Sequence, residues 1–257
     1  MNRIQQLFQR KNKNVLSVFC TAGYPQLNSL PGILQELQKN GVDLVEIGMP
    51  FSDPTADGPT IQYSNNIAIK NGMTLEVLFD QLKNIRNQIH IPLVLMGYIN
   101  PALQFGFEQF LQKARECGID GIIIPDLPMY EYETMYASLF HKYNIENIFL
   151  ITPQTTTERV RKIDSLSNSF IYTVSTHSIT GSNIDFSDTQ KKYFERIQAM
   201  GLKNPLIAGF GIRDKYTFDF ACSFLNGAII GSAFVKSIEN SKDLKNDIRA
   251  FVHSIIK

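Results

Sequence analysis

The sequence contains no tryptophan, only three cysteines and no long apolar run. No stretch reaches the roughly 18 apolar residues that a membrane-spanning helix needs, and residues 1–3 open an amphipathic helix rather than a signal sequence. Cys20, Cys117 and Cys222 are odd in number and widely spaced, which predicts reduced packing residues rather than disulfides or metal ligands. Phenylalanine and tyrosine, at 18 and 10 residues, can fill a core without tryptophan. We therefore expect a cytoplasmic protein with no membrane partner.

Charge of one sign is also lacking. The chain has 25 basic and 24 acidic residues, a formal net charge of +1 and no long charged run. Nothing in this balance favours a nucleic-acid or anionic-membrane partner, and we expect a small substrate. At 257 residues and 44% hydrophobic content, the chain has the length of one (β/α)8 barrel. We expect residues 1–257 to form that single domain.

Short apolar runs alternate with helical patterns eight times along the chain. Continuous apolar strands that alternate with helices imply a parallel sheet buried on both faces, and eight such units imply a closed α/β TIM barrel. We also expect an extra N-terminal helix and extended loops after strands 2 and 6. The expected strands are residues 15–20, 43–48, 92–97, 121–125, 147–152, 170–174, 205–209 and 228–231.

Polar residues before several helical patterns predict helix starts. Asn28 or Ser29 can cap the helix after the first strand, and Asp214 can cap the helix after the seventh. Thr155, with Glu158 three residues later, has the spacing of a capping box.

The architectural alternative is an open, doubly wound sheet. Its dinucleotide-binding forms carry G-x-G-x-x-G after the first strand, where this sequence reads T-A-G-Y-P at residues 21–25. We therefore favour the barrel and expect no NAD or FAD.

Acidic residues cluster around the second expected strand. Glu46 stands within an apolar run, where an unpaired ionised carboxylate costs several kcal/mol or takes up a proton. Asp53 and Asp57 follow in a proline-rich loop. Barrel sites lie on the loops after the strands. Other polar or glycine residues expected there are Tyr98, Asn100, Asp126, Thr180, Gly209 and Gly231.

Glycines after the last strands indicate an anion site. Gly211 follows the seventh strand, and Gly231 and Ser232 follow the eighth at the start of a short helix, while Gly181 in the sixth loop can add another amide. Backbone N–H groups in such turns favour phosphate. The alternative for each glycine alone is a tight turn that requires positive φ.

The histidines and lysines offer little chemistry. No histidine pair has metal-ligand spacing, no Ser-His-Asp or Cys-His arrangement occurs, and no lysine ends an expected strand. We therefore expect no metal. What remains is carboxylate acid and base chemistry on a phosphorylated substrate. Aromatic walls, each of which is alternatively core, would come from Phe19, Tyr98, Phe170, Tyr172 and Phe210.

These motifs together resemble the tryptophan synthase α subunit family. The run from Val45 to Gln62 reads V-E-I-G-M-P-F-S-D-P-T-A-D-G-P-T-I-Q and is similar to the family signature. Further similar runs are L-M-G-Y-I-N at 95–100, G-I-I-I-P-D-L-P at 121–128, T-G at 180–181, G-F-G-I at 209–212 and G-S-A at 231–233.

The resemblance implies retro-aldol cleavage of indole-3-glycerol phosphate to indole and glyceraldehyde 3-phosphate, with no cofactor in this chain. It makes Glu46 the proton-transfer group and Asp57 the ionised partner of the indole N–H. The implied indole and glycerol pocket comprises Phe19, Tyr98, Asp126, Tyr172, Thr180 and Phe210. The implied phosphate site comprises Gly181, Gly211, Gly231 and Ser232.

The resemblance also implies a partner. In this family a β subunit that uses pyridoxal phosphate joins indole to serine in an α2β2 heterotetramer. Pro50 and Asp53 would lie at or near that contact.

One departure and two rival functions stay open. Ser178 replaces a glycine that the family commonly has in the sixth loop, so loop closure can differ. The rivals are another phosphate barrel, such as a sugar-phosphate epimerase or isomerase, and a non-catalytic barrel that binds indole or a β subunit. For Asp53 and Asp126 the alternative is capping of local backbone.

Overall fold

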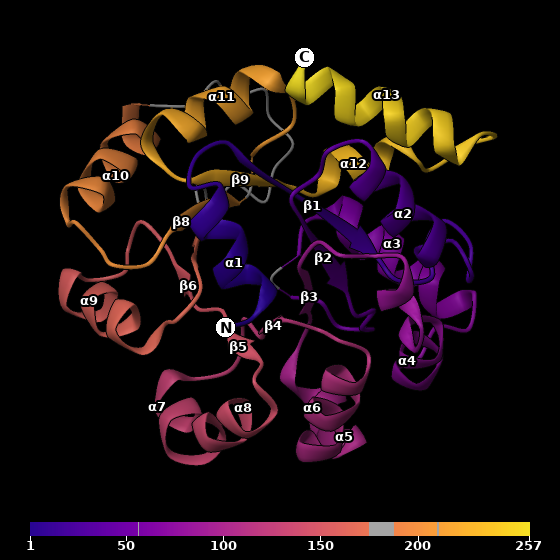
Figure 1. Ribbon diagram of the computed structural model, residues 1–257, viewed down its shortest axis with the longest axis horizontal. Coiled ribbons are helices and arrows are strands. Elements are labelled where there is room, and N and C mark those ends of the chain that lie inside the picture. The colour runs from indigo at the N-terminus through magenta and orange to yellow at the C-terminus, as the bar shows by residue number, and fades with distance from the viewer. Residues whose placement is uncertain (56, 175–187, 210) are drawn as a thin grey trace.

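The computed structural model describes residues 1–257 except Ala56, residues 175–187 and Phe210. Figure 1 looks along a ring of parallel strands that is surrounded by helices. The strands are β1 (Val15–Thr21), β2 (Leu44–Gly48), β3 (Leu93–Met96), β4 (Gly121–Ile123), β5 (Glu146–Asn147), β6 (Leu150–Ile151), β7 (Ile171–Val174), β8 (Leu206–Gly209) and β9 (Gly227–Ile230).

The strands close into a barrel in which the fifth position is occupied by two short consecutive strands, β5 and β6. The strand order is β5-β4-β3-β2-β1-β9-β8-β7-β6, with every pair parallel, so the two ends of the order are consecutive in the chain. Between them, the N–H of Ile148 donates to Ile122 O at 2.9 Å, and the N–H of Tyr172 donates to Phe149 O at 2.9 Å. The predicted barrel is confirmed and the open sheet is excluded, but the expected strand at 147–152 is two short segments.

The helices cover the outside of the barrel, and α1 lies across its N-terminal end (Figure 1). The larger ones are α1 (Arg3–Arg10), α2 (Leu30–Lys39), α3 (Pro59–Lys70), α4 (Leu75–Leu82), α6 (Phe107–Glu116), α9 (Thr157–Leu166), α10 (Asp188–Ala199), α11 (Lys215–Phe224) and α13 (Leu244–Ile256). The shorter ones are η1 (Ile85–Asn87), α5 (Ile99–Phe105), α7 (Met129–Glu131), η2 (Tyr132–Tyr136), α8 (Ala137–Tyr143) and α12 (Ser232–Ser237).

The N-cap residues of three helices can be compared with the predicted caps. Asp214 caps α11 in a capping box with Thr217, as predicted. The predicted Thr155 box is wrong, because Thr156 is the N-cap of α9 and the Thr155 hydroxyl instead accepts from the N–H of Thr152 at 2.9 Å. Ser29 precedes α2, but its side chain makes no capping hydrogen bond.

Strand register decides which side chains enter the barrel. Ser17, Phe19 and Thr21 are paired with Leu44, Glu46 and Gly48, so these residues face the same side of the sheet. A Cβ at Gly48 would lie 2.4 Å from the Phe19 ring. The glycine therefore makes room for an aromatic side chain inside the barrel.

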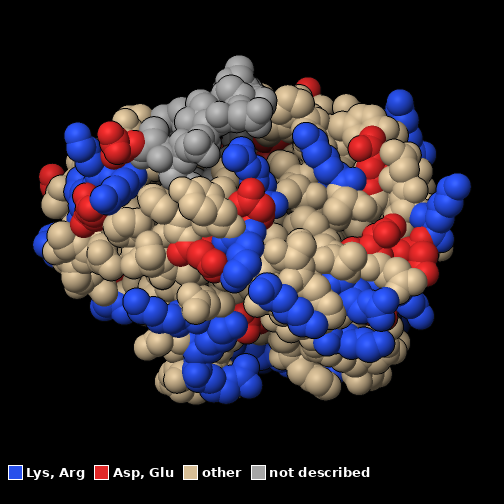
Figure 2. Space-filling view, turned by 90° about the horizontal axis from the view of Figure 1, so that it is seen from above, with Lys and Arg blue, Asp and Glu red and all other residues tan. Residues whose placement is uncertain are grey.

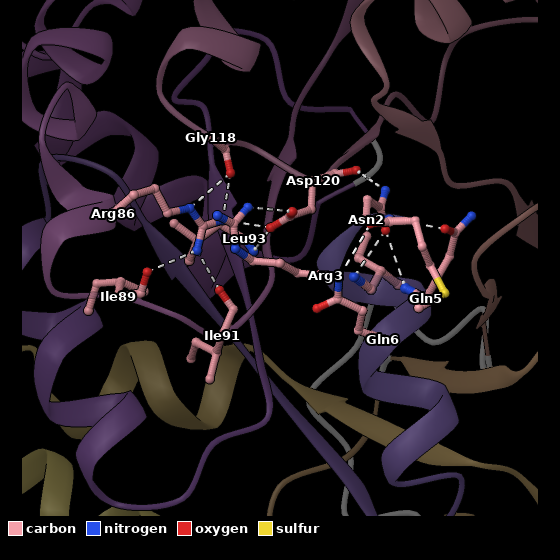
Figure 3. A network of polar contacts seen from close by, with 12 residues as sticks. Asn2, Arg3, Gln5, Gln6, Arg86, Ile89, Ile91, Leu93, Gly118 and Asp120 are labelled. Carbon is pink, nitrogen blue, oxygen red and sulfur yellow. Dashed lines mark hydrogen bonds and ion pairs between the residues drawn. The ribbon is translucent and has the colours of Figure 1, made fainter.

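An ion network holds α1 against the N-terminal ends of β3 and β4 (Figure 3). Asp120 is 1% exposed and pairs with Arg86 at 2.6 Å and Arg3 at 3.0 Å. Its Oδ2 also accepts from the N–H of Leu93 at 3.0 Å, and its carbonyl accepts from the side chain of Asn2 at 3.0 Å. Burial lowers the pKa of Arg86 to about 10, although Asp120 acts in the opposite direction.

Charged side chains of both signs occur on the side of the barrel that carries α11 and α13, with uncharged surface between them (Figure 2). This mixture agrees with the near-neutral net charge. Within the described ranges, no helix has the length and apolar character needed to cross a membrane.

Candidate active site

Glu46 lies inside the barrel on β2, between its register partners Phe19 and Val94. Its side chain is fully buried, and neither carboxylate oxygen has a hydrogen-bond partner among the described residues. Burial raises the pKa of Glu46 to about 8, while the nearby Ser17 hydroxyl lowers it slightly without the geometry of a hydrogen bond. Glu46 is therefore mostly a neutral carboxylic acid at pH 7, able to donate a proton.

Asp57 is held at the start of α3. Its N–H donates to Pro54 O at 3.1 Å, and its carbonyl accepts from the side chain of Gln62 at 2.9 Å. Burial raises the pKa of its carboxyl group to about 6, although a hydrogen bond from Tyr98 lowers it. A pKa of about 6 leaves Asp57 mostly ionised at neutral pH, and its carboxyl group is less solvated than the polar sequence of the loop suggests.

A pocket opens between the ends of β1, β2 and β3 and the start of α3. It brings together three of the predicted residues, Phe19, Asp57 and Tyr98. Glu46 is not among the lining residues, but it lies two residues before the lining residue Gly48 on the same strand and faces the same side of the sheet. The other lining residues are Gly48, Met49, Ile61, Asn65, Met96, Gly97 and Pro125.

Among the seven lining residues that were not predicted as site residues are Ile61 and Asn65. Both lie on α3, and Asn65 is a polar residue that is only 4% exposed. The signal was available in the spacing, because residues 61 and 65 are four apart and therefore share the face of α3 that begins next to Asp57. The site thus extends from the loop after β2 onto the following helix.

Tyr172 on β7 approaches both carboxylates. Burial raises the pKa of its phenol well above the usual value, and Glu46 and then Asp57 raise it further. A Cβ at Gly209 on β8 would lie 2.2 Å from the Tyr172 ring. The glycine lets the ring approach β8 closely, although Tyr172 is not among the pocket-lining residues.

The expected phosphate residues follow β8 and β9. Gly211 has φ +77°, a conformation that favours glycine, and Gly231 is the N-cap of α12, which starts at Ser232. A Cβ at Gly231 would lie 3.6 Å from the Cβ of Phe19. The glycine turn therefore borders the aromatic wall of the pocket. Of the other predicted residues, Thr180, Gly181 and Phe210 lie outside the described residues, as do His177 and Ser178.

Asp126, Asp53 and Pro50 are also outside the pocket lining. Asp126 is exposed and accepts from the N–H of Ile99 at 3.0 Å, at the start of α5. This contact is the backbone-capping alternative. Asp53 is exposed and accepts from the Ser52 hydroxyl, while Pro50 is half-buried directly after β2.

Possible metal ligands are scattered. Within the part of the chain that the structure describes, no three His, Cys, Asp or Glu residues are grouped to hold a metal ion. The three cysteines are buried and unpaired. The metal-free site stays a prediction.

These features define a class of protein. A closed parallel barrel with a pocket at the strand ends, an aspartate in the pocket lining and a buried carboxyl group on the adjoining strand has the architecture of the (β/α)8-barrel enzymes. Glu46 and Asp57 differ in charge at neutral pH because their burial differs.

Comparison with known proteins narrows the class. The sequence profile described as Tryptophan synthase alpha chain matches residues 5–255. A protein of that name from Flavobacterium johnsoniae is 56% identical over 255 residues, covering 99% of this chain and 100% of the relative. Another, from Bacteroides thetaiotaomicron, is 51% identical and covers 95% of each. The chain belongs to the tryptophan synthase alpha chain family.

Solved structures agree. Tryptophan synthase subunit alpha from Legionella pneumophila superposes with a TM-score of 0.89 at 31% identity, covering 99% of this chain and 97% of that chain. A mutant tryptophan synthase alpha-subunit from Pyrococcus furiosus superposes with a TM-score of 0.87 at 31% identity, covering 96% of this chain and 99% of that chain. Membership in the family implies a lyase role in tryptophan synthesis.

Proposed function

We propose that the chain cleaves indole-3-glycerol phosphate to indole and glyceraldehyde 3-phosphate. The observation that carries this proposal is the buried, unpartnered carboxyl group of Glu46, whose pKa is about 8. Cleavage requires a proton at indole C3 and removal of a proton from the side-chain hydroxyl. A carboxylic acid that is neutral before the reaction serves the first need, and its conjugate base serves the second.

Glu46 alone can carry out both proton transfers. Glu46 donates its proton to indole C3 and becomes a carboxylate. The carboxylate then takes the proton of the hydroxyl on the adjacent side-chain carbon as the carbon–carbon bond breaks and that carbon becomes the aldehyde. Glu46 is neutral again, and no oxidant, reductant or cofactor enters the step.

Asp57 supplies the opposite charge. Protonation at C3 places positive charge on the indole ring, and an ionised carboxylate beside the ring N–H stabilises it. The Tyr98 hydroxyl helps to keep Asp57 ionised in a half-buried position. Phe19, Tyr98 and Tyr172 form the aromatic wall for the indole in this proposal.

In this proposal the phosphate group of the substrate binds at the glycine turns that follow β8 and β9. N–H groups near Gly211, Gly231 and Ser232 would bind the phosphate, with Gly181 completing the site. Thr180 would help to position Asp57 when the sixth loop excludes water. Asp126, next to the lining residue Pro125, would contact the indole or glycerol part of the substrate.

We infer a β subunit as partner in an α2β2 heterotetramer, with pyridoxal phosphate held by that subunit. Pro50 and Asp53 are the proposed contacts, and both follow β2 at the active-site end of the barrel. Leu103 on α5 and Tyr130 on α7 are 46% and 75% exposed at the same end and supply apolar area for such a contact. The unpaired buried thiols support the proposed cytoplasmic location.

The test is indole release from indole-3-glycerol phosphate, measured for the native chain with and without a β subunit. We expect release by the chain alone and a higher rate with the partner. Asp57→Asn should lose most of the rate while still binding a phosphate analogue. No indole from folded, phosphate-binding protein under any condition would reject the lyase and favour a non-catalytic role.

A further inference from the structure

Ser17 places a second polar group beside Glu46. It lies on β1, two residues before Phe19, which is the register partner of Glu46, so both side chains face the barrel interior. Ser17 is 1% exposed, and its hydroxyl has no hydrogen-bond partner among the described residues. Since Glu46 is also unpartnered, two buried polar groups that normally demand partners lie side by side.

The surroundings of Glu46 offer few other polar groups. Burial raises the pKa of the Cys20 thiol to about 12, and the charge of Glu46 raises it further. Burial also raises the pKa of the Tyr172 phenol, with smaller contributions from Glu46 and Asp57. Of the described residues, Ser17 is the one that shifts the pKa of Glu46 toward the charged form. Val94, on the other side of Glu46, is apolar.

We propose that Ser17 is a positioning residue for Glu46, whose hydroxyl accepts a hydrogen bond from the neutral acid and donates one to the carboxylate. A hydroxyl can do both by rotation about one bond, because it carries one donor and two acceptor sites. It therefore follows the proton as Glu46 gives it to indole C3 and takes another from the substrate hydroxyl. This role rests on the proposed function of Glu46.

The amino acid at position 17 supports a specific role. Its neighbours Leu16 and Val18 are apolar and fully buried or nearly so, as is usual for a barrel strand. Alanine would fit the same position without the cost of a buried hydroxyl. A hydroxyl group that faces the interior beside the buried carboxyl group is useful when that group becomes charged.

The test compares Ser17→Ala with a matched control, Ser169→Ala. Ser169 also carries a buried hydroxyl without a partner in the described chain, but it lies before β7 at the N-terminal end of the barrel. The pKa of Glu46 is read from carboxyl carbon NMR of protein labelled at glutamate, with the signal assigned by its loss in Glu46→Gln. The kcat and KM for indole release are measured on the same proteins.

We expect Ser17→Ala to raise the Glu46 pKa by about one unit and to lower kcat by about tenfold with KM unchanged. Ser17→Thr, which keeps the hydroxyl, should restore both values, and Ser169→Ala should match the native protein. An unmoved Glu46 pKa, an unmoved kcat or an equal effect of Ser169→Ala would overturn the proposal. Failure of the lyase assignment would appear separately, as absence of indole from native protein whose NMR titration still reports the contact.

Discussion

The Tyr98 hydroxyl donates a hydrogen bond to the Asp57 carboxylate and thereby joins the end of β3 to the loop after β2. The bond stabilises the charged form of Asp57 and opposes the effect of burial. With both effects present the pKa of Asp57 is about 6, so the carboxyl group is mostly ionised at neutral pH. The ionised aspartate that the proposed reaction needs depends on this tyrosine.

Tyr98→Phe should move the acidic limb of the pH profile of kcat/KM upward by about one unit, because a hydrogen bond to a carboxylate is lost. The measurement is kcat/KM for indole release from pH 5 to 9. Substrate phosphate titrates equally with both proteins, so only the difference between the profiles reports Asp57. Tyr216→Phe, at a site 64% exposed on α11, is the control and should reproduce the native profile. If the acidic limb of the Tyr98→Phe profile matches that of the native protein, Tyr98 does not control the pKa of Asp57.

Much of this arrangement was predictable from residue patterns. Apolar runs with helical spacing between them predicted the barrel, and a carboxylate in one of those runs identified Glu46. The caps were harder, because Thr155 and Thr156 are adjacent hydroxyls and only the local backbone decides which one caps α9. The break in the fifth strand also has no pattern, since residues 147–152 alternate too little to show where pairing passes from β4 to β7.

The pKa values and hydrogen bonds of the site residues could not be predicted from the sequence. Asp57 stands in a loop of polar and proline residues, yet burial raises its pKa to about 6 although the hydrogen bond from Tyr98 acts in the opposite direction. Asp126 lies in a motif with the right sequence but bonds to Ile99 instead of lining the pocket. Burial and local hydrogen bonding depend on segments distant in sequence, which a motif does not report.

Glu46→Gln should change the pH dependence of stability. The pKa of Glu46 is raised to about 8 in the folded state, so the folded protein holds a proton that the unfolded chain releases between about pH 4.5 and 8. Native stability should therefore fall as pH rises through this window, by roughly 1.4 kcal/mol per pH unit from this group alone. Glutamine removes the titration.

The measurement is urea unfolding of native protein and Glu46→Gln from pH 5 to 9. The advantage of the variant should grow with pH and level off above about 8, while the exposed Glu158→Gln should track the native protein. A constant difference at all pH values would contradict the raised pKa.

Gly209→Ala should damage the site through Tyr172. The new Cβ would lie 2.2 Å from the ring, which must move away from the two carboxylates. We expect a loss of about 1–3 kcal/mol in stability, together with reduced indole release. Thermal unfolding and the activity assay measure both. Gly32→Ala on α2 has no atom within 4 Å of its Cβ and should be neutral or slightly stabilising.

Asp120→Ala should destabilise the fold without touching the chemistry. It leaves Arg86 and Arg3 without their carboxylate at the end of the barrel opposite the pocket (Figure 3). We expect a loss of about 3–5 kcal/mol, as for other broken buried ion pairs, with kcat unchanged at low temperature. Glu116→Ala breaks an exposed pair with Lys113 and should leave Tm unchanged. Equal Tm values for the two variants would show that the network adds no stability.

A single cooperative transition should accompany these measurements. The buried core is continuous from α1 to α13, so residues 1–257 should unfold as one domain. Coincident far-ultraviolet circular dichroism and tyrosine fluorescence curves would support this. Two separated transitions would indicate that part of the barrel unfolds independently.

The most direct test of the account is the rate of indole release by Glu46→Gln compared with native protein, both shown to be folded and to bind a phosphate analogue equally. Glutamine keeps the shape of the side chain but can neither donate nor accept the proton in the proposed steps. The account predicts a loss of kcat of about 10²–10⁴-fold with phosphate binding unchanged. A variant that releases indole at the native rate would show that Glu46 does not transfer the proton, and the mechanism would be wrong.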